Sequence, residues 1–204
     1  DRRAVDDHLR CAGLVASGAM CVIMWCMTAR HFTLDYTEHA ELRDGTKVLL
    51  RLLRPTDKGL LDAGFKLLSP ESRYARFFTP KSSLSDDELN YLTEIDHESH
   101  LAIGAVIERN GEQIGLGIAR FIRLADRPET AEAAIVVTDE VQRQGLGRLL
   151  LLRLIAAARE RGIERFRFEV LSSNGGMVNL IAAVAPERTV TTAAGELSIE
   201  VVLR

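Results

Sequence analysis

The chain has few of the residues that mark specialised classes of protein. Of its 204 residues only three are cysteines and five are prolines, and the formal net charge is −3. Three cysteines are too few to hold a disulfide scaffold together. A balance this close to neutral argues against a general nucleic-acid binder, which is usually basic, so we expect no nucleic-acid partner. The remaining composition, 47% hydrophobic and 27% charged, is that of a globular domain with its own core.

Charge is missing from one stretch, residues 11–28, which reads CAGLVASGAMCVIMWCMT and holds all three cysteines. Eighteen uncharged residues are just enough for a membrane span. A signal peptide is not indicated, because no basic region precedes the stretch and no small-x-small cleavage site follows it. The cysteines have no histidine at zinc-ligand spacing, so we predict no metal site there.

Three interpretations of residues 11–28 stay open. The stretch is a membrane anchor, a buried or dimerising helix, or translated sequence upstream of a start at Met27. We therefore treat residues 1–41 as an N-terminal extension without catalytic residues. The expected location is the cytoplasm, or a membrane surface if residues 11–28 form an anchor.

Residues 42–204 alternate strand and helix patterns, which predicts one α/β domain on a mixed sheet. An Asn110-Gly111 turn favours a hairpin on either side of it. Helices are expected at residues 56–68 and 85–93. Further helices are expected to begin at residue 70, to run from after residue 147 to Arg161, and to begin after Asn174. Strands are expected at 47–54, 100–108, 113–124, 131–138, 163–171 and 196–203.

The sequence QRQGLG, residues 142–147, joins a predicted strand to a predicted helix. Backbone N–H groups at a helix start lack partners and attract anionic oxygens. Gly145 and Gly147 let such oxygens approach the backbone, and Arg143 and Arg148 add charged contacts. The loop is neither a Walker A sequence nor a dinucleotide fingerprint, because it lacks Gly-Lys-Ser/Thr and the third glycine. It therefore predicts a phosphate or pyrophosphate site.

In this context VVTDEVQRQGLGRLLLLRLI resembles motif A of the GNAT N-acetyltransferases, whose pattern Q/R-x-x-G-x-G/A is met by Gln142, Gly145 and Gly147. The flanking segments AEAAIVV and RFRFEVLSSN match family strands, so the resemblance extends over about residues 47–203. LSPESRYARFF and ELNYLTEIDHESHLA resemble a bacterial branch that includes protein lysine acetyltransferases. The resemblance implies a GNAT-like mixed, mostly antiparallel central sheet with helices on both faces.

The resemblance also implies that acetyl-CoA is the co-substrate. Asn174 matches an asparagine that often contacts the cofactor, although by itself it is equally a helix cap. The N–H of Val137 would polarise the acetyl carbonyl as an oxyanion hole. Family members lay the pyrophosphate on the loop, here Arg143, Gln144, Gly145, Leu146, Gly147 and Arg148, and the pantetheine arm along the preceding strand, here Val136, Val137 and Thr138.

Attack on a thioester needs a neutral amine, so a base must take its proton. Glu132 is the candidate, since a glutamate recurs there in the resembling protein acetyltransferases; its plainer interpretation is a solvated carboxylate. Many family members place a tyrosine seven residues after the asparagine as general acid, but here that position is Ile181. His97 and His100 have no third ligand in reach, so no metal is predicted.

These residues predict an N-acetyltransferase in which a primary amine attacks bound acetyl-CoA directly in a ternary complex. The amine belongs to a protein lysine or to a small molecule, and the acidic stretch 86–98 would suit a cationic acceptor. The alternative is a non-catalytic acyl-CoA-binding regulatory domain. Ile181 favours that alternative and Glu132 disfavours it.

Overall fold

A computed structural model describes residues 30–203, and the apolar segment 11–28 lies outside the described residues. No helix within 30–203 is long and apolar enough to cross a membrane. The strands are β1 (Thr37–Glu41), β2 (Lys47–Leu52), β3 (His100–Arg109), β4 (Glu112–Arg123), β5 (Thr130–Val137), β6 (Arg165–Leu171), β7 (Arg188–Ala193) and β8 (Glu196–Val202).

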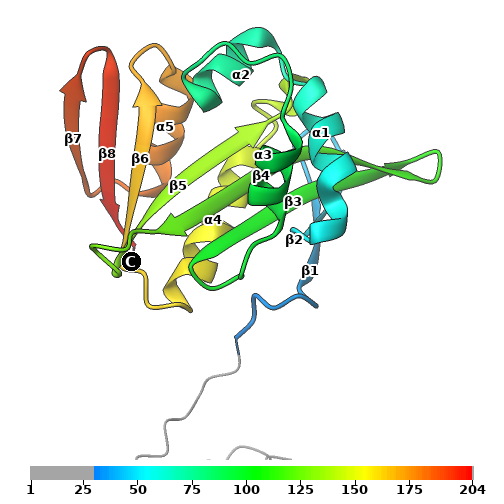
Figure 1. Cartoon of the computed structure of the whole chain (residues 1–204), viewed down its shortest axis with the longest axis horizontal. Helices are drawn as coiled ribbons and strands as arrows, with labels where there is room; N and C mark the ends of the chain where they lie inside the picture. Colours follow the sequence, from blue (N-terminus) through cyan, green and yellow to red (C-terminus); the bar gives the residue numbers. More distant parts are fainter. Residues whose placement is uncertain (1–29, 204) are drawn as a thin grey trace, which may run out of the picture.

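The eight strands within residues 30–203 form one sheet in the order β1-β2-β3-β4-β5-β6-β8-β7 (Figure 1). Every neighbouring pair is antiparallel except β5 with β6. The mixed, mostly antiparallel sheet expected from the sequence is therefore confirmed.

Helices cover both faces of this sheet, with α1, α2 and α3 on one side and α4 and α5 on the other (Figure 1). Local residues set their starts: Ser69 accepts a hydrogen bond from Ser72 N–H ahead of α2, and Ser85 forms a capping box with Glu88 ahead of α3. The bounds are α1 (Lys58–Lys66), α2 (Pro70–Phe77), α3 (Asp86–Thr93), α4 (Leu146–Arg159) and α5 (Gly175–Val184), with short 3-10 helices at Pro55–Asp57 and Asp139–Val141.

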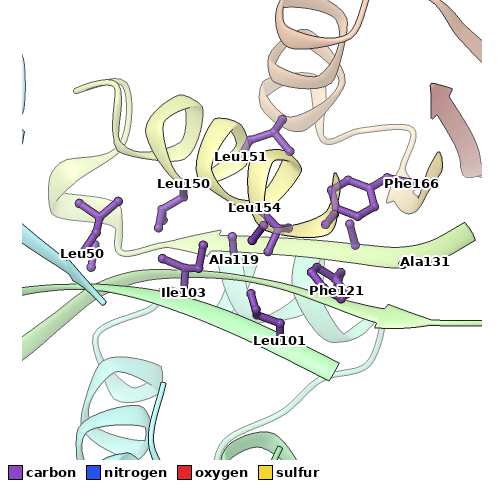
Figure 2. Packing of buried hydrophobic residues seen from close by; sticks show 14 of the residues in the cluster. Leu50, Leu101, Ile103, Ala119, Phe121, Ala131, Leu150, Leu151, Leu154 and Phe166 are labelled. Atoms are coloured by element: carbon purple, nitrogen blue, oxygen red, sulfur yellow. The ribbon is translucent and has the colours of Figure 1, made fainter. Parts of the chain in front are cut away.

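The main core lies between α4 and the middle of the sheet (Figure 2). Leu146, Leu150 and Leu154 recur every four residues along α4 and are fully buried. They meet strand residues such as Ile103 and Phe121, which are also fully buried. This packing fixes the first turn of α4, and with it the glycine loop, against the sheet.

Two strands were missing from the order predicted by sequence, β1 and β7. Both are edge strands with polar sequences, and none of the residues of β7 is buried. Neither sequence alternates apolar with polar residues, which is the signal of a half-buried strand. β1 lies before residue 42, where we placed the start of the domain, yet it extends the same sheet. Phe32 and Tyr36, 3% and 4% exposed, belong to its core.

Candidate active site

The sheet opens between β5 and β6. Their parallel pairing covers only Thr130–Glu132 with Arg165–Arg167, and beyond it the two strands diverge towards α2 (Figure 1). A cleft of about 970 Å³ occupies this end of the molecule. It is lined by the end of β5, the glycine loop, the start of α5 and one side of α2.

The direction of the β5 backbone decides which N–H groups face this opening. Thr138 N–H donates to the carbonyl of Leu116 at 2.8 Å, on the β4 side. Because N–H groups alternate along an extended strand, the N–H of Val137 points the other way, towards β6. The pairing with β6 has ended by that point, so this N–H faces the cleft.

The glycine loop has the backbone of an anion site. Arg143 and Gly145 have positive φ angles of 63° and 96°, and the first regular helical bond runs from Leu149 N–H to Gly145 O at 3.0 Å. The N–H groups of residues 146–148, between Gly145 and Leu149, therefore lack helical acceptors and point outward. At Gly147 a Cβ would lie 3.3 Å from Leu180 Cδ2, so a side chain there would crowd α5 as well as any ligand.

The structure brings most of the predicted cofactor residues together. Seven of them line the large cleft: Val136, Val137, Arg143, Gly145, Gly147, Arg148 and Asn174. Leu146 is fully buried in the core, so it can offer only its backbone. Gln144 contributes a carbonyl that accepts from Arg43 N–H, and Thr138 lines a separate, smaller cavity.

Asn174 has the contact expected of a helix cap and also lines the cleft. Its Oδ1 accepts from Met177 N–H at 3.1 Å, at the start of α5. Ile181, at the position where many relatives carry a tyrosine, is 1% exposed within the core. Tyr74 of α2 is 45% exposed and lines the cleft, so a phenol is present from a different element.

Arg43 is a cleft residue that the sequence analysis missed. It follows β1, its backbone N–H donates to Gln144 O at 3.1 Å, and its Nε lies 4.0 Å from the Cβ position of Gly145. It therefore adds a third arginine beside the loop, with Arg143 and Arg148. No sequence signal connects Arg43 to the loop, because 99 intervening residues separate it from Arg143 and no motif covers it.

A second set of contacts holds α2 against the loop region. The carboxylate of Asp139 accepts from Ser69 and Ser72, and Gln142 Nε2 donates to Ser72 Oγ, Asp139 Oδ1 and the Val137 carbonyl, each at 3.3 Å. Burial alone would raise the pKa of Asp139, but these hydrogen bonds outweigh burial and lower it. Gln142 is therefore a support for the cleft wall.

Glu132 lies at the closed end of the β5–β6 opening. Its side chain is 49% exposed and pairs with Arg167 at 3.3 Å. It lies four residues before Val136 and faces the same side of the sheet, about 13 Å along the strand. Its negative charge helps to keep Arg76 of α2 protonated, against the burial that lowers the pKa of Arg76.

The other residues considered from the sequence have contacts of their own. Asp96 Oδ1 accepts the backbone N–H groups of Glu98, Ser99 and His100 at 2.8–2.9 Å. Burial lowers the pKa of His100 to about 4, so its imidazole is neutral at pH 7. His100 Nε2 can then accept from Arg120 Nη1, 3.1 Å away.

A mixed sheet that opens beside an anion-binding loop, with a backbone N–H facing the opening, can hold a phosphorylated donor and polarise its carbonyl, as acyl transfer requires. Comparison with known proteins identifies the family. The model of the acetyltransferase (GNAT) family matches residues 65–183. The chain belongs to this family.

Individual relatives agree with this assignment. An acetyltransferase of Pseudomonas aeruginosa is 30% identical over 143 residues, which are 70% of this chain and 76% of that protein. The acetyltransferase Pat of Mycolicibacterium smegmatis is 32% identical over 147 residues; the match covers 67% of this chain but only 40% of Pat. The crystal structure of the GNAT domain of S. lividans PAT superposes with a TM-score of 0.74 at 29% identity, covering 82% of this chain and 97% of that domain.

Proposed function

We propose that this chain transfers the acetyl group of acetyl-CoA to a primary amine that attacks the thioester directly in a ternary complex. The observation that carries the proposal is one continuous cleft, which joins the glycine loop to the open edge of β5. A phosphorylated donor needs the glycine loop for its phosphates, and an acyl carbonyl needs a backbone N–H at the open edge of β5. Membership of an acetyltransferase family supports acetyl-CoA as that donor.

The backbone supplies the expected donor contacts. Pyrophosphate oxygens would accept from the N–H groups at residues 145–148, with Arg43, Arg143 and Arg148 adding positive charge. The acetyl carbonyl would accept from Val137 N–H, which faces the opening. Negative charge develops on that oxygen as the amine adds, so a fixed N–H donor there stabilises the transition state more than the ground state.

We assign Glu132 the role of general base, because the resembling protein acetyltransferases carry a glutamate at this position. The amine nitrogen forms a bond to the carbonyl carbon, the C–S bond breaks, and the CoA thiolate leaves. The proton lost from the amine passes along a chain of several water molecules to Glu132, because about 13 Å of strand separates Glu132 from Val136. The thiolate takes a proton from water or from the phenol of Tyr74, which lines the cleft.

A non-catalytic acyl-CoA-binding domain is the second candidate. Ile181 favours it, since a buried aliphatic side chain cannot protonate the leaving thiolate. The two candidates predict the same acetyl-CoA binding and differ only in turnover.

The deciding experiment follows release of the free CoA thiol across a screen of amines, amino acids and lysine peptides. We expect turnover with at least one acceptor class and loss of kcat by about 10²-fold or more in Glu132→Gln, with acetyl-CoA affinity unchanged by calorimetry. Glu164→Gln, an exposed carboxylate outside the cleft, is the matched control and should behave as wild type. Tight acetyl-CoA binding without acetylation of any acceptor would favour the binding domain, and full activity of Glu132→Gln would remove Glu132 from the mechanism.

A further inference from the structure

A small cavity lies next to the cleft, on the side of the sheet covered by α1, α2 and α3. Its volume is about 80 Å³ and most of its lining is apolar, from residues such as Leu61, Phe65 and Leu92. Arg76 and Val136 line both this cavity and the large cleft. Arg76 and Val136 therefore mark where the cavity and the cleft adjoin.

Three arginines enter this apolar cavity, and one of them is neutralised by the protein. Arg51 makes two hydrogen bonds to the carboxylate of Asp57, at 2.6 and 2.8 Å, and both side chains are more than nine-tenths buried. This is the usual arrangement for a buried guanidinium, because an unpaired buried charge is costly.

Arg120 is buried without such a partner. It is 5% exposed, and its hydrogen bonds go to two neutral groups, the His100 imidazole and the Leu92 carbonyl at 3.3 Å. Within residues 30–203, neither Arg120 nor Arg76 forms an ion pair with a carboxylate. Burial, and then the charge of Arg76, lower the pKa of Arg120 to about 9. In the part of the chain that the structure describes, the cavity is therefore lined by two nearby positive charges that no carboxylate of the lining neutralises. The negative charge of Glu132, which acts on Arg76, comes from outside this lining.

We propose that Arg120 and Arg76 bind the carboxylate of the acceptor, so that the acceptor is a small molecule with both an amine and a carboxylate. This inference rests on the proposed function. A guanidinium forms paired hydrogen bonds with a planar carboxylate, and these bonds are strongest in a site that excludes water. A volume of about 80 Å³ fits a carboxylate and a few more atoms, but not a peptide chain.

A purely structural role for Arg120 makes a different prediction. Its bond to Leu92 O places a cation at the carboxyl end of α3, which by itself stabilises a helix. In that case, replacing Arg120 would lower stability and affect all acceptors alike. A carboxylate site instead predicts that the effect depends on the acceptor.

The test compares free amino acids with their primary amides in the CoA-thiol assay, with a lysine peptide blocked at both ends and O-phosphoethanolamine as further acceptors. We expect wild type to prefer the free acids. Arg120→Met should raise KM for the acids about ten- to a hundredfold, the range of a lost charge-assisted hydrogen bond pair, and leave KM for the amides unchanged. Arg76 lies on the partly exposed face of α2, so Arg76→Gln should also raise KM for the acids and not for the amides, without a change in the fold.

Arg109→Met is the control, since Arg109 lies at the exposed end of β3 and lines neither the cavity nor the cleft. Three results would overturn the carboxylate site while acetyl-CoA binding persists. Acids and amides could react equally, the blocked lysine peptide or O-phosphoethanolamine could be preferred, or KM could change equally for every acceptor. Loss of acetyl-CoA binding in wild type would overturn the proposed function and this inference together. If acetyl-CoA binds without turnover, the site is tested by thermal unfolding instead. Stabilisation of wild type by the free acids but not by the amides, with no such stabilisation in Arg76→Gln, supports the carboxylate site. No stabilisation of wild type by the acids refutes it.

Discussion

Asp139 accepts hydrogen bonds from both the backbone N–H and the hydroxyl of Ser69, at 2.8 and 3.1 Å, across 70 residues of sequence. Ser69 also caps α2 by accepting from Ser72 N–H, and Ser72 Oγ in turn donates to Asp139 at 2.8 Å. One carboxylate therefore joins the start of α2 to the turn that precedes the glycine loop. The position of the cleft wall depends on this junction.

Replacing Asp139 by alanine should loosen α2. We expect a loss of about 1 kcal/mol in the free energy of unfolding, a modest value because this carboxylate is exposed to solvent. Acetyl-CoA affinity should fall as well, since α2 lines the cleft. Urea unfolding and calorimetry measure the two effects. Asp126→Ala, an exposed aspartate outside the cleft, should change neither, and an unaltered cofactor affinity in Asp139→Ala would contradict the role of the junction.

The same junction gives a pH dependence with a definite sign. The pKa of Asp139 is lowered in the folded chain, because the hydrogen bonds from Ser69 and Ser72 outweigh the opposing effect of burial. Its contribution to stability is therefore complete above the ordinary aspartate pKa of about 4 and is lost as the pH falls through the lowered value. The stability difference between wild type and Asp139→Ala should be constant from pH 5 to 8 and shrink in stronger acid. A difference that grew on acidification would contradict this assignment.

The pair Arg51–Asp57 should be far more important for stability than a surface pair. Asp57→Asn leaves Arg51 buried without a counter-charge, so we expect a loss of about 3–5 kcal/mol. Asp62→Asn breaks the exposed pair with Lys66 in the same part of the fold, and should cost less than about 0.5 kcal/mol. Urea unfolding of the two variants gives the comparison. Similar losses in the free energy of unfolding would show that burial does not determine how much these pairs stabilise the fold.

The parts that could be predicted from the sequence are those that neighbouring residues determine. The glycine loop, the helices expected from residue 70 and at 85–93, and the Asn110-Gly111 turn each depend on a few adjacent residues. The edge strands β1 and β7 could not be recognised, because their polar sequences do not alternate apolar with polar residues. Arg43 and Arg120 could not be assigned either, since long-range pairing alone brings them to the loop and the cavity. The role of Glu132 stays a prediction.

Gly145 should be sensitive to the smallest side chain, because its φ of 96° is unfavourable for any residue with a Cβ. Gly145→Ala should lose about 1–2 kcal/mol of stability and weaken acetyl-CoA binding by distorting the loop. Gly59→Ala is the matched control: nothing lies within 4 Å of its Cβ position and it sits inside α1. That variant should gain up to about 1 kcal/mol. Thermal unfolding and calorimetry on both proteins check the contrast, and a neutral Gly145→Ala would contradict the strained loop.

Arg43 should contribute to donor binding through charge alone. Its contact with Gln144 is made by the backbone N–H, so Arg43→Gln keeps that hydrogen bond and removes only the guanidinium. An exposed arginine beside a phosphate site contributes a charge-assisted contact that salt weakens. We expect the Kd of acetyl-CoA to rise about tenfold at low ionic strength, equivalent to about 1.4 kcal/mol, and the difference from wild type to shrink in about 0.5 M salt. Arg109→Gln, at the exposed end of β3, should leave the Kd unchanged. Equal Kd values for wild type and Arg43→Gln at low ionic strength would exclude Arg43 from the donor site and leave the anion to the loop, Arg143 and Arg148.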